Sequence, residues 1–478
     1  MSDLNQDETP VLDAIAATRD DGVHSFGLPG HRFGEKVDQH AVEVLGRSSY
    51  AADVKMAKSA VPQAERLYAA AVGARDAIFT TCGSSISVHT AILSLVGPGD
   101  RVLVDRNVHK SVVAGLIQAG AEPVWLRPSW DHENEIAHPA SREAVEQALR
   151  NEPDIRAVIM ITPTEYGTGA DVSGIAAAVH AQGIPLMVDE AWGCHFGFHP
   201  SPPTAAVVAG ADVAVQSLHK AGGGLCQASV ILVGGDLIET TDLRLRLDLL
   251  TTTSPSALVY GSIDGWRRHA VQHGRELIDG ALARADHARR RLGAIDGFSV
   301  LDDSIHSREG VAEWDPLKLS VDVSGLGMTG YQVRDWLLEE CAIACQLADA
   351  RRVLMSITYA DQDRDIGALV SALERLASDP LQLANPAPMI PPLEELDLEQ
   401  VLSPREAFFS ATEQVRDPVG RIAAEMVSPY PPGVPAVLPG ERWNAATAEY
   451  LRAGKAAGMT IPDAGDPTLD TFRVVRQR

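Results

Sequence analysis

Residues 155–190 read IRAVIMITPTEYGTGADVSGIAAAVHAQGIPLMVDE and decide the fold class. An apolar run rich in Ile and Val (155–162) is followed by a helix-like run (174–183) and by a second apolar run (184–190). Continuous apolar runs of this length are typical of strands that are covered on both faces. Two such strands separated by a helix predict a parallel pair in an α/β protein.

The same alternation continues on both sides of this stretch. Strand-like runs occur at 76–81 (DAIFTT), 100–105 (DRVLVD) and 212–217 (DVAVQS). Helix-like runs occur at 61–73 (VPQAERLYAAAVG), 86–97 (ISVHTAILSLVG) and 142–150 (REAVEQALR). We therefore expect a mainly parallel sheet covered by helices on both faces.

The length of 478 residues exceeds one ordinary core, so several domains are expected. The patterns indicate an N-terminal segment (1–58), a large α/β domain (59–265), a smaller α/β domain (266–378), a Pro-rich linker (379–392) and a C-terminal domain (393–478).

Composition excludes some classes of function. Asp and Glu number 64 against 41 Lys and Arg, a net charge of −23, which argues against a nucleic-acid-binding surface. The N-terminus shows no secretory signal pattern, and no apolar run is long enough to span a membrane. Five cysteines without a CxxC pair favour reduced thiols and a cytoplasmic protein.

Three predicted strand ends carry polar side chains that could do chemistry. Gly83, Ser84 and Ser85 lie between a strand and a helix, where backbone N–H groups and hydroxyls can hold a phosphate, although these serines could simply cap the helix. Asp189 ends an apolar strand, as a carboxylate partner for a cation or as a structural ion pair.

The third strand end is the most suggestive. Ser217, His219 and Lys220 follow an apolar run, and glycines come directly after the lysine in SLHKAGGG. Only seven lysines occur in the chain, so an interior lysine is unusual here. A buried lysine loses part of its basicity and becomes a nucleophilic amine, whereas a lysine on a surface loop does not.

Taken together, the three ends supply the parts that a pyridoxal 5'-phosphate site requires. The lysine can bind the cofactor aldehyde, and the aspartate can keep the pyridine nitrogen protonated. In α/β sheets, ligands bind beyond the carboxyl ends of the strands, where these residues are expected.

At these residues the chain resembles the Orn/Lys/Arg decarboxylase family, in its short form without an N-terminal receiver-like domain. The similar segments are LPGHRFG (28–34), CGSS (82–85), DRNVHKSV (105–112), ITPTEYGT (161–168), VDEAWGCHFGFHP (188–200), SLHK (217–220), TTTSPSALVYGSID (251–264), SPREAFF (403–409), GRIAAEM (420–426) and PYPPGVPAVLPGE (429–441). The resemblance implies a fold-type-I pyridoxal-phosphate enzyme with a mainly parallel seven-stranded sheet.

The resemblance also implies roles for individual residues. Lys220 would bind the cofactor aldehyde, with Asp189 at the pyridine nitrogen, His109 stacked on one ring face and Ala191 on the other. Ser84, Ser85, Ser217 and His219 would hold the phosphate. Trp192, Thr253, Ser254 and Glu413 would face the substrate, Thr253 and Ser254 by reaching the neighbouring subunit of a homodimer or larger homo-oligomer. No metal is implied.

The implied reaction is decarboxylation of a basic amino acid, namely arginine, ornithine or lysine, as in polyamine biosynthesis. An aminotransferase or another pyridoxal-phosphate reaction on the same scaffold is the nearest alternative, and a non-catalytic regulator is a further one. Two departures from the family bear on the substrate: Gln346 stands where a Glu is common, and Trp192 where many members have His.

Overall fold

The structure is a computed structural model that describes residues 4–20, 54–380, 397–429 and 433–477. The motif at 28–34 and most of the predicted linker lie outside the described residues. The chain divides into two compact units, the first comprising Met1–Ser94, Pro185–Pro200 and Thr204–Arg275, and the second Leu95–Ile184, Ser201–Pro203 and Glu276–Arg478. The domain boundaries expected from the sequence stay a prediction.

The first unit contributes the elements that carry Ser84, Asp189 and Lys220. Its strands are β1 (Asp76–Thr80), β8 (Leu186–Asp189), β9 (Val213–Ser217) and β10 (Ser229–Val233). Its helices are α1 (Pro10–Asp20), α4 (Val54–Val72), α5 (Gly83–Leu95), α9 (Thr240–Leu250), the start of α10 (Ala257–Gly293), and a 3-10 turn at Phe196–Phe198.

The second unit contributes the elements around His109 and the C-terminal part of the chain. Its helices are α6 (Lys110–Ala119), α7 (Arg142–Asn151), α8 (Val172–His180), α11 (Gly330–Cys341), α12 (Asp363–Ser378), α14 (Pro404–Phe409) and α15 (Ala445–Ala456), with 3-10 turns at Asp303–Ser307 and Ser324–Leu326.

The strands of the second unit are more numerous and mostly short. They are β2 (Arg101–Asp105), β3 (Glu122–Leu126), β4 (Ser129–Asp131), β5 (Ile136–His138), β6 (Ile155–Ile161), β7 (Thr168–Gly169), β11 (Ser299–Val300), β12 (Glu313–Trp314), β13 (Lys318–Asp322), β14 (Leu347–Ala348), β15 (Arg352–Ser356), β16 (Thr412–Val415) and β17 (Phe472–Val475).

The large sheet has seven strands in the order β1-β10-β9-β8-β6-β2-β3. The pairs β8–β9, β2–β6 and β2–β3 are parallel, whereas β10 runs antiparallel to both β1 and β9. Strands β8, β9 and β10 are buried along their whole length, as expected for strands covered on both faces. The predicted α/β class and the mainly parallel seven-stranded sheet are confirmed.

Local sequence signals set several helix ends. Ser141 caps α7 by accepting a hydrogen bond from the N–H of Ala144 (3.2 Å), and Thr329 with Gln332 forms a capping box at the start of α11. The helix predicted at 61–73 ends at Gly73, which has a φ of 75°. Glycine tolerates this left-handed conformation, which other residues rarely adopt, so it ends the helix.

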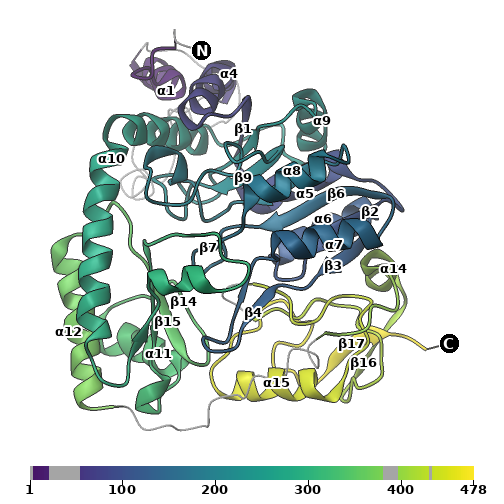
Figure 1. Cartoon of the computed structure of the whole chain (residues 1–478). Helices are drawn as coiled ribbons and strands as arrows, with labels where there is room; N and C mark the ends of the chain where they lie inside the picture. Colours follow the sequence, from purple (N-terminus) through teal and green to yellow (C-terminus); the bar gives the residue numbers. More distant parts are fainter. Residues whose placement is uncertain (1–3, 21–53, 381–396, 430–432, 478) are drawn as a thin grey trace, which may run out of the picture. The chain divides into compact units, whose positions relative to one another are not determined.

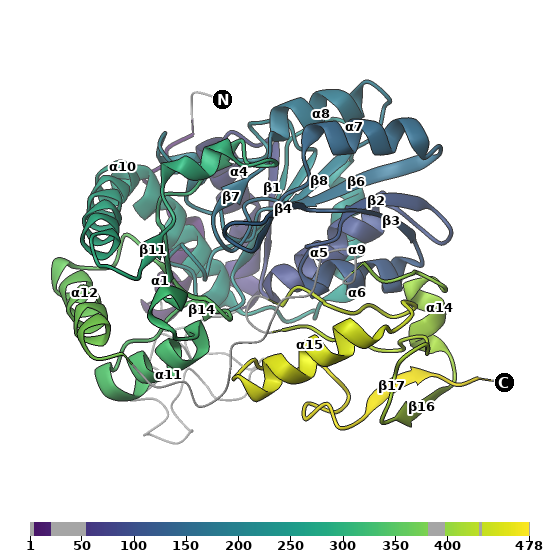
Figure 2. The same ribbon diagram turned by 60° about the horizontal axis from the view of Figure 1, so that its bottom comes forward.

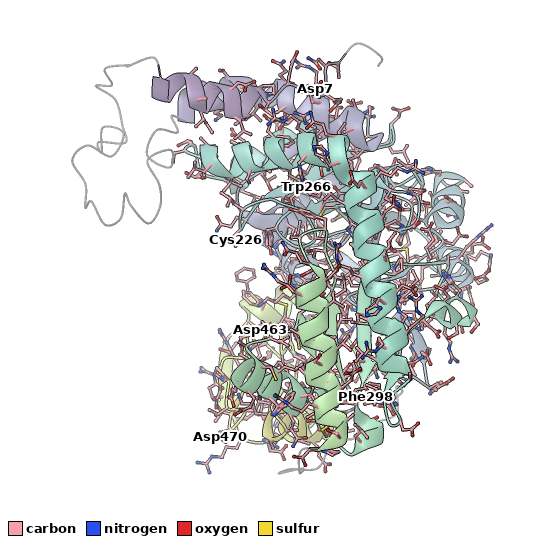
Figure 3. The ribbon with its side chains drawn as sticks, turned by 90° about the vertical axis from the view of Figure 1, so that its left-hand side faces the viewer. Asp7, Cys226, Trp266, Phe298, Asp463 and Asp470 are labelled. Atoms are coloured by element: carbon pink, nitrogen blue, oxygen red, sulfur yellow. The ribbon has the colours of Figure 1, made fainter. Side chains whose placement is uncertain are left out.

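Within the second unit, the C-terminal half of α10 and α12 lie side by side (Figure 3). Ion pairs join them at both ends, between Arg284 and Asp363 and between Arg291 and Glu374. A four-stranded antiparallel sheet, β11-β13-β15-β14, belongs to the same region. These elements form the smaller α/β layer that the sequence predicts.

The C-terminal residues pack onto α6 and β3 within the second unit (Figures 1 and 2). Arg405 of α14 donates to the carbonyls of Ile117 and Gln118 at the end of α6, at 2.7 and 3.0 Å. Strands β16 and β17 form a separate antiparallel pair, from Thr412↔Val475 to Val415↔Phe472. In the described part of the chain, no helix combines the length and apolarity needed to cross a membrane.

Candidate functional site

Asp189 and Lys220 come from neighbouring parallel strands of the first unit. β8 ends at Asp189 and β9 ends at Ser217, three residues before Lys220, and Asp189 is paired in register with Val215. Parallel neighbours end at the same edge of a sheet, so both side chains are delivered to that edge. Asp189 is only 3% exposed, and its Oδ1 accepts a hydrogen bond from the N–H of Ala191 (3.2 Å).

The electrostatics of this pair suit a bound cation. Burial raises the pKa of Asp189 above its usual value, while the Lys220 ammonium and the Ala191 N–H act in the opposite direction. The Nζ of Lys220 lies 3.6 Å from the centre of the Trp192 ring, which places the ammonium against the negative face of the indole. A buried carboxylate of this kind is stabilised when a cationic ring nitrogen is placed beside it.

The glycines after Lys220 are needed for close packing. A Cβ on Gly222 would lie 2.7 Å from the carbonyl oxygen of Leu218, and one on Gly224 would lie 2.8 Å from the Cβ of Ala228. Any larger residue would push the loop away from the end of β9. Gly222 and Gly224 therefore allow the chain to fold back tightly just after the lysine.

The predicted phosphate turn lies at the start of α5. Gly83 has a φ of 78°, and its conformation turns the chain from β1 into the helix. The Ser217 Oγ donates to the Ser84 Oγ at 2.6 Å, so the turn and the end of β9 are joined directly. Ser85 is exposed, in keeping with a hydroxyl open to a ligand. The helix N-terminus adds N–H groups that attract an anion.

His219 has a fixed hydrogen-bonding role on one side of its ring. Its Nδ1 lies 3.2 Å from the carbonyl oxygen of Ala228, and since a carbonyl only accepts, Nδ1 carries the proton. Burial lowers the pKa of His219 below its usual value, with Lys220 acting in the same direction. In the neutral ring Nε2 is an acceptor, so His219 must gain a proton before it can donate to a phosphate.

His109 lies in the second unit, at the start of α6. Its Nδ1 accepts a hydrogen bond from the N–H of Ser111 (3.2 Å) and lies 2.8 Å from the Ser111 Oγ, so the histidine caps the helix. β2 ends four residues earlier at Asp105, which is fully buried. The stacking role of His109 stays a prediction.

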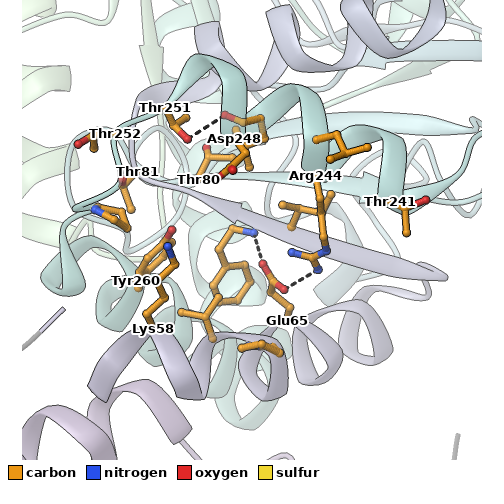
Figure 4. Close-up of a pocket in the computed structure, with 17 residues that line it drawn as sticks. Lys58, Glu65, Thr80, Thr81, Thr241, Arg244, Asp248, Thr251, Thr252 and Tyr260 are labelled. Carbon is orange, nitrogen blue, oxygen red and sulfur yellow. Dashed lines mark hydrogen bonds and ion pairs between the residues drawn. The ribbon is translucent and has the colours of Figure 1, made fainter. Parts of the chain in front are cut away.

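Thr253 and Ser254 are exposed between α9 and α10, and their contact with another subunit stays a prediction. Beside them lies a cavity of about 530 Å³ lined by Thr80, Thr81, Thr251 and Thr252 among others (Figure 4). Its wall contains the buried Glu65, which pairs with Arg244 (2.7 Å) and accepts from the N–H of Phe79 (2.9 Å).

Glu413 and Gln346 both lie in the second unit and have partners within it. Glu413 is on strand β16, where its carboxylate pairs with Arg421. Gln346 accepts a hydrogen bond from the Nζ of the buried Lys318 (3.1 Å) and another from Ser356. Neither residue was expected to have these partners, because the contacts join segments that are separate in the sequence.

The donor set of the first unit fits pyridoxal phosphate. Its lysine amine matches the aldehyde of the cofactor, and its buried carboxylate matches the pyridine nitrogen. Its two serine hydroxyls at a helix N-terminus match the phosphate. Among the described residues, no cluster of His, Cys, Asp or Glu is arranged to hold a metal ion.

Some contacts within the second unit were missed by sequence reasoning. Arg106, inside the DRNVHKSV segment, pairs with Glu441 (3.1 Å), and the two residues are 335 positions apart. Both residues lie in segments that resemble the family, so the sequence indicated that the segments matter. It did not indicate that Arg106 and Glu441 pair with each other. Asp105 gave no signal beyond ending an apolar strand.

Comparison with known proteins agrees with this chemistry. Residues 9–365 match the model of the Orn/Lys/Arg decarboxylase major domain, and residues 394–464 match that of the family's C-terminal domain. The chain is 34% identical to an arginine decarboxylase of Halalkalibacterium halodurans, over 99% of this chain and 98% of that protein. It is 32% identical to an arginine decarboxylase of Bacillus subtilis, over 99% of both chains.

A solved structure with a similar fold is also a decarboxylase. The structure of the constitutive lysine decarboxylase of E. coli superposes with a TM-score of 0.81 at 21% identity, covering 98% of this chain and 82% of that one. At this identity the likeness concerns the fold. With the family models covering most of the chain, the protein belongs to the Orn/Lys/Arg decarboxylase family and is a pyridoxal-phosphate-dependent amino acid decarboxylase.

Proposed function

We propose that the protein decarboxylates arginine and releases CO₂ and agmatine. Agmatine is an amine from which polyamines can be made. The proposal is supported by the two relatives named arginine decarboxylase, which are 34% and 32% identical over nearly the whole chain. The observation that carries the chemistry is the buried Asp189 beside Lys220 at the ends of adjacent parallel strands.

Each of several side chains of the first unit would have its own role in the reaction. Pyridoxal phosphate, when bound, draws off the electron pair that the departing carboxylate leaves on Cα. Lys220 would hold the cofactor aldehyde until the substrate amine replaces it, and its Nζ would then return a proton to Cα. Asp189 would keep the proton on the pyridine nitrogen, and Ala191 would pack on the ring beside it. Trp192 would border the substrate.

Phosphate binding would fall to the residues joined at the start of α5. Ser84 and Ser217 are already hydrogen-bonded to each other, and Ser85 is exposed next to them. His219 would donate from Nε2 once it is protonated. From the second unit, His109 would stack on the pyridine ring.

We further propose a cytoplasmic homodimer, or a larger homo-oligomer, that shares its sites between subunits. Thr253 and Ser254 support this, because they are exposed within the single chain. Mixing Lys220→Ala chains with chains that carry Thr253→Ala and Ser254→Ala should restore part of the activity, since one site of each heterodimer then has all intact residues. No recovery after demonstrated subunit exchange would contradict shared sites.

The proposed function is tested by incubating purified protein with a panel of amino acids and identifying the products. Arginine should give CO₂ and agmatine, and Lys220→Ala should lose both turnover and the visible absorbance of the bound cofactor. A keto acid product would indicate an aminotransferase. If only lysine or ornithine is turned over, the proposed substrate is wrong. If the protein neither turns over any amino acid nor binds the cofactor, a non-catalytic regulator is favoured.

A further inference from the structure

The loop that carries His109 has little support of its own. Residues 106–109 join β2 to α6, and inside the loop the N–H of Val108 makes a long hydrogen bond to the carbonyl of Asp105 (3.4 Å). Asn107 donates to the carbonyl of His138 at 3.3 Å. Bonds of this length are weak, and the stronger bond from the N–H of Arg106 to the carbonyl of Leu126 (2.9 Å) fixes only the start of the loop, so the rest of the loop depends on other contacts.

The strongest outside contacts come from segment 433–441, in the C-terminal part of the chain. Arg106 donates through Nη1 to the carbonyl of Pro435 (2.7 Å) and through Nη2 to both carboxylate oxygens of Glu441 (3.1 and 3.2 Å). Glu441 is 2% exposed and also accepts from the N–H of Leu438 (2.7 Å). A buried carboxylate with three such hydrogen bonds holds a fixed position, and so fixes the guanidinium.

The same segment holds the chain on the other side of His109. The N–H of Lys110, in the first turn of α6, donates to the carbonyl of Gly433 at 3.0 Å. First-turn N–H groups have no partner within their helix, so this bond satisfies a donor that would otherwise be open. The Nζ of Lys110 lies 3.6 Å from Asp463, which is itself bound to the N–H of Ser428.

Apolar packing secures the helix behind the histidine. Leu438 is fully buried against Val113 and Ile117, which lie on successive turns of α6, and Trp125 and Met426 border this cluster. Segment 433–441 therefore contacts the loop before His109, the residue after it, and the helix that it caps. Contacts at all three points restrict the movement of the backbone that carries the histidine.

We infer that segment 433–441 positions His109 for the cofactor, with Arg106 and Glu441 as positioning residues. The inference rests on the proposed role of His109 and goes beyond it, because it gives the C-terminal domain a part in the reaction. A domain that only adds stability would not need a buried ion pair directed at this one loop.

The test compares Glu441→Gln with Glu399→Gln in the full-length enzyme. The exposed Glu399 pairs with the half-buried Arg442 at 2.8 Å. The control therefore breaks an ion pair of the residue next to Glu441, and this pair does not reach the loop. Melting temperature, kcat, KM for arginine and the visible circular dichroism of the bound cofactor are measured for each. For Glu441→Gln at saturating cofactor, we expect kcat to fall at least tenfold and the dichroism per bound cofactor to decrease.

The control should match the wild type in kcat and dichroism. A lower melting temperature with wild-type kcat and dichroism in Glu441→Gln would reduce the pair to a stabilising contact and overturn the inference. If Glu441→Gln does not fold, Arg106→Lys replaces it, because lysine keeps the charge and loses the forked contact. The same fall in kcat and dichroism is then expected, and a wild-type result again overturns the inference.

A double variant separates this inference from the proposed function. If Glu441 acts through His109, Glu441→Gln should have little further effect on kcat in a His109→Ala background. Fully additive losses would show that Glu441 acts elsewhere. A wild-type enzyme that binds no cofactor would instead refute the proposed function, and this is measured before any variant.

Discussion

Asp105 is the buried acid whose titration the structure predicts most directly. It is the last residue of β2 and is fully buried. Its Oδ2 accepts one long hydrogen bond from the N–H of Ala140 (3.4 Å), and within the described residues its Oδ1 has no hydrogen-bond partner. Burial raises the pKa of Asp105 from 3.8 to about 7, against a small opposing effect of the Ala140 N–H. The replacement Asp105→Asn keeps the shape and removes the titration.

The sign of the effect follows from proton binding. Between pH 4 and 7 the folded state keeps a proton that the unfolded chain has lost, so the stability of the wild type falls as the pH rises. A carboxyl pKa raised from 3.8 to about 7 corresponds to a loss of about 4 kcal/mol, complete above pH 7. The Asp105→Asn variant does not suffer this loss. Its stability relative to the wild type should therefore increase from pH 5 to pH 8.

Urea denaturation of both proteins without added cofactor, at equal protein concentration and at several pH values, measures this difference. Other titrating groups are common to both chains and cancel. Asp296→Asn, at an exposed position, is a matched control for the loss of one carboxyl group. A constant difference between Asp105→Asn and the wild type from pH 5 to pH 8 would falsify the reasoning, since Asp105 would then be ionised in the folded protein as it is in water.

Three further predictions concern the site. Asp189→Asn should still bind the cofactor, yet kcat should fall by about 100-fold or more because the pyridine nitrogen loses its anionic partner; a near-normal kcat would make Asp189 structural. In the wild type, cofactor affinity should decline with rising pH, because the neutral His219 cannot donate to the phosphate, and His219→Gln should remove part of this decline. Identical pH profiles of cofactor affinity for the variant and the wild type, in titrations followed by absorbance, would contradict this. Glu413→Gln should lower kcat/KM for arginine with no change in cofactor absorbance, whereas an unchanged kcat/KM would confine Glu413 to its ion pair with Arg421.

Local sequence signals were sufficient for the strand ends and insufficient for long-range pairs. Asp189 and Ser217 each follow an apolar run, and such runs encode both the strand and its end, so the site at the sheet edge could be predicted. The bond between Arg106 and Glu441 joins residues 335 positions apart, and no periodicity specifies it. The expectation for Glu413 did not include strand β16 or Arg421, because a short, half-buried strand gains its identity from β17, its pairing partner.

Gln346 is a departure from the family whose surroundings the structure describes. From the sequence alone, an amide in place of a carboxylate favours a less acidic substrate pocket. In the structure its Oε1 accepts from the Nζ of Lys318, which is 2% exposed, and from Ser356 on the neighbouring strand β15. The charge that the family commonly carries here would therefore face a buried lysine, and its absence changes the interior of the small sheet. Since the Nε2 of Gln346 has no hydrogen-bond partner in the described part of the chain, the neutral amide is the poorer fit. The printed contacts of Gln346 thus lie inside its own sheet region, and they give no reason to move the substrate away from arginine.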